Sequence, residues 1–450
     1  MAHSDARGNP CSSDSPAARD AAESALWRLM SFYDTPLADL DAAIAADPGW
    51  VLPYVMKAGF LISLTEPELG AEASAQLALA QERSTRATLR ERAHLDAVQH
   101  LLEGRWHRAA RHWDELLIEH PRDALALQWA HLWDLHRGDT TGLRLRPARV
   151  LPEWDTADAL HPYVLGMYAF GLEENNLHAQ AEDIGRQALQ ADARGPWAVH
   201  AVAHVMEMQG RFEEGSAWLR QYQPHWADGN GFAGHLWWHQ ALFRLEAMDA
   251  AGALRLVDKY LSGETLQITL QRVDAASLLW RLHLLGEDVA ERAAALVADW
   301  PAGDHHAGLH AFNDVHLVVA LLAARNAARA EAWVARCAER ALDAEDARRA
   351  NHAVAREFAL PLMRGLLALE RGDADGAVDA IYPVRALARC LGGSHAQRDL
   401  VEQTLLHAAA RGGRRTLGRA LVNERLMAKP QTPLTRHWAD RLGTHEGARA

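Results

Sequence analysis

The chain has 450 residues, of which 49% are hydrophobic, so it can bury a large core. Its formal net charge is −12, and no basic run is interleaved with aromatic residues, which argues against a nucleic-acid-binding protein. Three widely spaced cysteines without CxxC spacing favour a reducing, cytoplasmic location and exclude a thiolate metal site. No apolar run approaches about 18 residues, so no membrane span is predicted.

The composition divides the chain into three parts. Residues 1–24 are rich in Ser, Asp, Ala and Gly and predict a disordered N-terminal arm. Residues 25–437 predict a single helical-repeat domain, because alanine, leucine, arginine and glutamate recur at helical spacing. Residues 438–450 predict a polar C-terminal tail.

Turn-forming residues recur along the predicted domain at intervals of 34 to 46 residues. Each interval fits one helix-turn-helix unit, as in tetratricopeptide-type arrays. We therefore predict an all-α fold, an irregular tetratricopeptide-like α-solenoid of about ten to twelve helix pairs wound into a right-handed superhelix. Such a superhelix can curl around a central pocket. The turn positions are Gly104, Gly138, Asn175, Gly210, Asp249, Gly286, Asn326, Gly372 and Gly412.

Two stretches carry histidine pairs at i, i+4 spacing, His200/His204 and His235/His239. On a helix this spacing directs both imidazoles of a pair to one side, where they can reach one metal ion. The residue after His200 is alanine, so the HExxH motif of zincin proteases is absent. The alternative is that these are core histidines, each hydrogen-bonded between packed helices.

Further donors accompany the histidine pairs. Glu207 follows His204 by three residues, and Asp314 and His316 lie in the motif Asn-Asp-Val-His. Glu207 and Asp314 are candidates for a metal ligand, a general base or a partner that orients a histidine. Nitrogen and oxygen donors suit a divalent metal, Zn or Fe above others. The pattern leaves open one ion or two, and water activation or oxygen chemistry.

Candidate substrate contacts surround these motifs. Asp274 and Arg281 share one helical face, where they form an ion network or hold an anionic group. Arg398 follows the helix-capping Ser394, at a corner suited to an anion or to capping alone. The aromatic candidates, which can equally be core residues, are Tyr168 and Trp238.

Several of these segments together resemble the tetratricopeptide repeat protein 38 family, also described as StaR-like. The resemblance covers about residues 25 to 437 and departs from the family pattern at Leu132 and Leu236. It implies helical repeats and little about activity, and the sequence does not support the flavin role suggested for one branch. The matching segments are 166–174, 197–208, 235–243, 312–316, 392–399 and 424–434.

Two classes of function remain open from the sequence. The histidine motifs favour a metal-dependent enzyme, hydrolytic or oxygen-using, that acts on a small and anionic metabolite. A related possibility is a metal-free enzyme with a histidine as general base. The alternative is a non-catalytic scaffold that binds a protein or peptide. A homodimer is compatible with either class.

Overall fold

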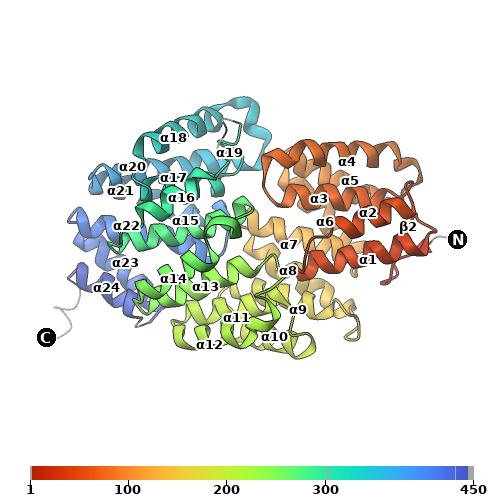
Figure 1. Ribbon diagram of the computed structural model, residues 1–450, viewed down its shortest axis with the longest axis horizontal. Coiled ribbons are helices and arrows are strands. Elements are labelled where there is room, and N and C mark those ends of the chain that lie inside the picture. Colours follow the sequence, from red (N-terminus) through yellow and green to blue (C-terminus); the bar gives the residue numbers. More distant parts are fainter. Residues whose placement is uncertain (1–2, 302, 304, 431, 444–450) are drawn as a thin grey trace. The chain divides into compact units, whose positions relative to one another are not determined.

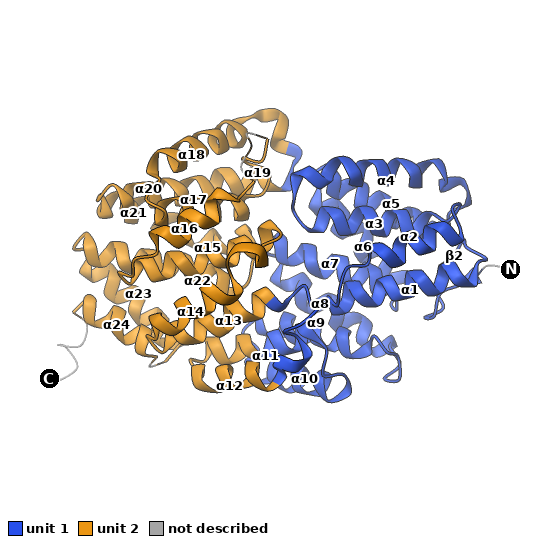
Figure 2. Ribbon diagram, viewed as in Figure 1, with its two compact units in different colours: residues 1–202, 222–233, 348–350 blue, residues 203–221, 234–347, 351–450 orange. Residues whose placement is uncertain are grey.

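The computed structural model describes residues 3–301, 303, 305–430 and 432–443. The fold is all-α, as predicted, with one pair of two-residue strands. Among the described residues, no helix is both long and apolar enough to cross a membrane. Figure 1 shows the helices along the chain, and Figure 2 shows that it forms two compact units.

Unit 1 comprises residues 1–202, 222–233 and 348–350. Each helix packs against its neighbour in sequence, for example α3 with α4 and α9 with α10. Strands β1 (His3–Ser4) and β2 (Pro10–Cys11) form an antiparallel hairpin. The helices are α1 (Pro16–Ser31), α2 (Leu37–Ala46), α3 (Val51–Ser63), α4 (Gly70–Glu82), α5 (Leu89–Leu102), α6 (Trp106–Glu119), α7 (Ala124–His136), α8 (Thr140–Val150), α9 (His161–Glu173), α10 (His178–Ala191) and the first half of α11 (Pro196–Met208).

Unit 2 comprises residues 203–221, 234–347 and 351–450. Helix α15 packs against both α17 and α22, which brings distant parts of the sequence together. A π-helical segment, Ala355–Ala359, precedes α20. Besides the end of α11, the helices are α12 (Phe212–Tyr222), α13 (Ala233–Glu246), α14 (Ala250–Tyr260), α15 (Thr269–Leu284), α16 (Ala290–Ala298), α17 (Ala311–Ala323), α18 (Ala327–Leu342), α19 (Ala350–Val354), α20 (Leu360–Glu370), α21 (Ala374–Ile381), α22 (His395–Arg411), α23 (Arg415–Ala428) and α24 (Pro433–Arg441).

The domain boundaries differ from those expected from the sequence. Residues 3–24, expected to be a disordered arm, contain the β-hairpin and the first half of α1. The expected single domain, 25–437, divides into the two units. Helix α24 extends into the expected C-terminal tail, of which residues 444–450 lie outside the described residues.

Small residues and capped turns explain why consecutive helices pack closely. Gly171 on α9 lies so near the backbone of α8 that an added Cβ would be 2.2 Å from the carbonyl oxygen of Leu143. Turn glycines predicted from the intervals, such as Gly138 and Gly286, have φ values of +68° and +97°. Asp249, another predicted turn residue, caps α14 by accepting from the backbone of Gly252. These glycines and Asp249 therefore form the turns and the helix cap that the sequence predicts.

Candidate metal centre

Three histidines of unit 2 bring ring nitrogens together. His204 lies on α11, and His235 and His239 lie one turn apart on α13. One nitrogen of each ring lies within 4.8 Å of the corresponding nitrogens of the other two. The Nε2 atoms of His235 and His239 are 3.2 Å apart, and the rings of His204 and His239 are 4.5 Å apart between centroids. The i, i+4 pair on α13 thus converges.

A carboxylate stands behind each histidine of α13. Nδ1 of His235 lies 2.7 Å from Oδ2 of Asp274, and Nδ1 of His239 lies 3.2 Å from Oε2 of Glu207. A carboxylate oxygen accepts, so these contacts place the proton of each neutral ring on Nδ1. The two Nε2 atoms face each other on the opposite side of the rings, 3.2 Å apart. A carboxylate that holds Nδ1 of a histidine, while Nε2 of the same ring faces a second histidine, is an arrangement typical of metal sites.

Electrostatics keep Glu207 and His239 in the forms that a metal site requires. Burial raises the pKa of Glu207, but the charge of Lys429 and the hydrogen bond with His239 lower it overall, to about 2. Burial, followed by the neighbouring His204, lowers the pKa of His239 to about 3, although its bond with Glu207 opposes this shift. Near neutral pH, Glu207 is therefore an anion and His239 a neutral imidazole, which is the form that binds metals.

A buried charge network supports Glu207 from the C-terminal part of unit 2. Lys429 Nζ lies 3.1 Å from Oε1 of Glu207 and 3.0 Å from Oε1 of Glu246. Arg425 donates to Glu246 at 3.3 Å and also pairs with Asp399. Each buried charge of the network thus faces an opposite charge, which offsets the cost of its desolvation.

Helix α15 supplies the other supporting side chains. Asp274 accepts from His235 through Oδ2 and from Gln397 through Oδ1, at 3.2 Å. Arg281 donates to the carbonyl oxygens of Ser277 at 3.0 Å and Ala396 at 2.7 Å. These backbone contacts give the guanidinium of Arg281 a structural task, and its contact with an anionic group stays a prediction.

Trp238 lies beside the histidines. Its ring stacks on that of His235 with 5.1 Å between centroids, and its Nε1 donates to Oγ of Ser277 at 3.0 Å. Trp238 is buried. It therefore fixes the His235 ring from behind and, in the structure as it stands, is a packing residue of the site.

Asp314 and His316 are separated by the geometry of α17. Residues at positions i and i+2 of a helix are about 200° apart, so the side chains of Asp314 and His316 face nearly opposite directions. Asp314 accepts from Nε1 of Trp333 at 3.1 Å, and burial raises its pKa to about 7. His316 Nδ1 lies 2.7 Å from the carbonyl oxygen of Phe312. Within the described residues, neither belongs to the histidine cluster.

The roles of the remaining predicted site residues, His200, Tyr168 and Arg398, stay predictions. His200 precedes His204 by one turn on α11 and belongs to unit 1, where its ring lies 5.0 Å from Phe170 and 5.1 Å from Phe232 between centroids. Tyr168 is a half-buried residue of α9, also in unit 1. Arg398 on α22 donates to the carbonyl of Gly393 in the preceding loop.

Several members of the site were not identified from the sequence. Lys429 could have been singled out from the sequence, since it is one of only three lysines in a chain rich in arginine. Glu246 follows His239 by seven residues, which is two turns along the same face of α13. Nothing local marks Asp399, Arg425 or Gln397 as partners, because each acts through a residue more than 20 positions away.

No protein-family model matches the chain. Among solved structures, the chain is similar to one described as a human IFIT1 dimer with m7Gppp-AAAA. The identity is 13% and the TM-score is 0.40, over 97% of this chain and 96% of that one. The helices described above define this protein as an all-α helical-repeat protein, and unit 2 adds a buried histidine cluster to that fold.

Proposed function

We propose that unit 2 binds one divalent metal ion through His204, His235 and His239. The observation that carries the proposal is the pair of Nε2 atoms 3.2 Å apart, each on a ring whose Nδ1 contacts a carboxylate. Two nitrogen ligands of a tetrahedral zinc ion, at about 2.0–2.1 Å from the metal, are themselves about 3.3 Å apart. The space between the rings therefore suits a metal ion without rearrangement of α13.

The ligand chemistry favours zinc-type water activation over an iron site of two histidines and one carboxylate. Glu207 and Asp274 both contact histidine Nδ1 atoms, so they orient ligands rather than occupy a ligand position. His204, His235 and His239 would hold the ion as neutral ligands, so it would keep its full positive charge, attract anionic groups and supply water activation near neutral pH.

Access to the proposed site is through His235. Its side chain is 16% exposed, whereas that of His239 is fully buried. A small molecule can therefore approach the cluster from the His235 side while Glu207 and Lys429 remain behind it. We infer that the protein is a metal-dependent enzyme acting on a small, anionic substrate. The alternative function, a non-catalytic scaffold that binds a protein or peptide, uses the same helices and requires no metal ion.

Elemental analysis of tag-free protein tests the proposal. We expect about one metal ion per chain in the native protein and almost none in His235→Ala or His239→Ala, because two nitrogen ligands cannot retain the ion. His283→Ala is the matched control, since His283 lies on α15 of the same unit, is one-third exposed and is outside the cluster. Circular dichroism establishes that each variant is folded.

A second variant separates the metal site from a structural histidine network. Asp274→Asn keeps the shape of the side chain but weakens its hold on His235, so zinc affinity falls by about 10–100-fold. Competition with a chromogenic chelator measures this change. Native protein that stays metal-free after incubation with zinc contradicts the proposal and leaves the scaffold function. Equal metal loss in His283→Ala also contradicts it.

A further inference from the structure

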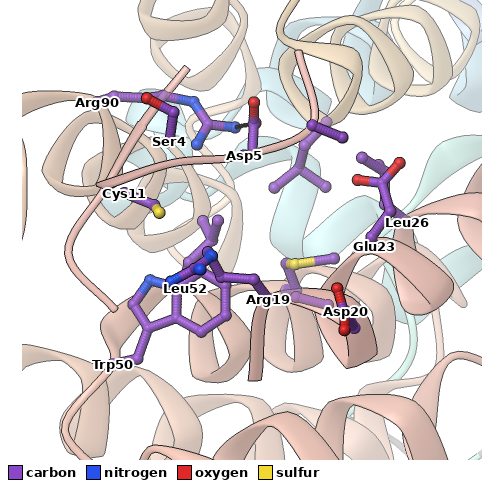
Figure 3. Close-up of a pocket in the computed structure, with 14 residues that line it drawn as sticks. Ser4, Asp5, Cys11, Arg19, Asp20, Glu23, Leu26, Trp50, Leu52 and Arg90 are labelled. Carbon is purple, nitrogen blue, oxygen red and sulfur yellow. Dashed lines mark ion pairs between the residues drawn. The ribbon is translucent and has the colours of Figure 1, made fainter. Parts of the chain in front are cut away.

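The N-terminal hairpin of unit 1 covers a pocket that is separate from the histidine cluster. The pocket has a volume of about 220 Å³ and is bounded by the hairpin and by side chains of α1, α3, α5 and α7 (Figure 3). All of its lining residues belong to unit 1. The residues expected to be a disordered arm thus form one wall of a cavity.

One part of this pocket is apolar. Leu26, Leu52, Met56 and Leu125 line it and are buried, and the indole ring of Trp50 lies against the same space (Figure 3). Trp50 Nε1 donates to Glu91 at 2.6 Å, so the polar edge of the ring is already satisfied. This part of the pocket therefore suits a short hydrocarbon chain.

Arg90 lines the other part with an unused donor. Its side chain is 3% exposed, Nε donates to Oδ2 of Asp123 at 2.6 Å, and Nη2 lies 3.6 Å from Oδ2 of Asp5. Its Nη1 is buried and has no hydrogen-bond partner among the described residues. A buried charged donor without an acceptor is costly, so an acceptor supplied by a ligand would stabilise it.

A second cation borders the same space. Arg19 on α1 donates through Nη1 to the carbonyl of Ser13 at 2.9 Å, and no carboxylate of the described residues lies within 4.0 Å of it. The acidic neighbours Asp5 and Glu23 are engaged by other groups of the hairpin segment, while Asp20 is exposed to solvent. Arg19 and Arg90 are therefore the charged donors that line the pocket.

We propose that this pocket binds a small monocarboxylate with a short apolar chain. The carboxylate contacts Nη1 of Arg90 and the guanidinium of Arg19, and the chain lies against Leu52 and Met56. A cavity of about 150 Å³ holds benzene, so a pocket of about 220 Å³ has room for pentanoate, which is only slightly larger. This proposal does not depend on the metal site.

Calorimetric titration of the full chain with pentanoate tests the proposal, after treatment with a chelator so that no metal binds the carboxylate. We expect pentanoate to bind. Acetate, which lacks the apolar chain, and pentanamide, which lacks the charge, are each expected to bind at least about ten-fold more weakly. Arg19→Gln is expected to weaken pentanoate binding by a similar factor. Its control is Arg111→Gln on the exposed face of α6, where the side chain is 81% exposed.

A filling variant locates the ligand without changing charge. Ala22 lines the pocket, so Ala22→Met occupies part of its volume and is expected to reduce pentanoate affinity, whereas Ala17→Met on the exposed face of α1 leaves it unchanged. A pentanoate concentration of about 10 mM is far above a useful dissociation constant, so absence of binding at that concentration overturns the proposal. So does native-like binding by both Arg19→Gln and Ala22→Met.

Discussion

Replacing Lys429 by methionine removes the cation that joins two carboxylates of unit 2. The Lys429 side chain is 3% exposed and its Nζ lies 3.1 Å from Glu207 and 3.0 Å from Glu246. Methionine retains most of the volume, so the packing changes little while the charge disappears. Glu207 keeps His239 as a partner and Glu246 keeps Arg425, but both carboxylates lose their shared ammonium group.

The magnitude follows from the pKa of Glu207. Its fall from 4.5 to about 2 corresponds to about 3 kcal/mol of stability at pH 7, and the charge of Lys429 is the largest cause that lowers this pKa. Breaking a buried pair by removing one partner costs about 3–5 kcal/mol, which agrees. A carboxylate with a lowered pKa contributes this stability above its unfolded pKa and loses it as the pH falls from about 4.5 towards 2. The deficit of Lys429→Met is therefore largest near pH 7 and shrinks in acid.

Guanidinium unfolding followed by tryptophan fluorescence measures the effect at pH 7 and at pH 4 and below. Lys259→Met is the control, because Lys259 lies on the exposed surface of α14 in the same unit, where such changes cost less than about 0.5 kcal/mol. A loss below about 1 kcal/mol at pH 7, or a loss that does not change with pH, would refute the reasoning.

Two further predictions concern stability. Burial raises the pKa of Asp314 from 3.8 to about 7, so its protonated form favours the folded state below pH 3.8, and this contribution is lost as the pH rises through about 7. Urea unfolding is therefore expected to find Asp314→Asn about 4 kcal/mol more stable than the native protein at pH 8 and about equal to it below pH 3.8. A lower stability of Asp314→Asn at pH 8 contradicts this. Gly171→Ala is expected to lower the thermal midpoint of unit 1 clearly, because its Cβ would meet the Leu143 backbone at 2.2 Å, whereas Gly70→Ala, with open space around it, is neutral. Calorimetry distinguishes the two, and equal midpoints would show that α8 and α9 separate easily.

Helical spacing was sufficient to predict the parts of the site that depend on one helix. His235 and His239 converge because i and i+4 lie on one face of α13, and the turn residues recur because each repeat needs a capped turn. The same rule separates Asp314 from His316, since residues at positions i and i+2 of a helix are about 200° apart and face nearly opposite directions. The motif Asn-Asp-Val-His grouped them by nearness in sequence alone.

The parts that depend on tertiary contacts could not be predicted. Lys429 reaches Glu207 across 222 residues, and Arg281 reaches the carbonyl of Ala396 across 115. No local pattern encodes which distant helix α15 or α11 will meet. The N-terminal hairpin was missed for another reason: its polar composition is that of a flexible arm, yet Asp5 and Asn9 bond to each other and fix the turn.

The sequence distance between Lys429 and Glu246 has a consequence for synthesis of the protein on the ribosome. Glu246 is made 183 residues before Lys429. At about 5–20 residues per second, this delay lasts roughly 10 to 40 s. During that time the nascent chain carries the acidic groups of the site without their cation, and water must remain around them. Closure of this part of unit 2 thus waits until the segment that carries Lys429 has been made, and a chain that terminates before this segment is left with unpaired acidic groups in its interior.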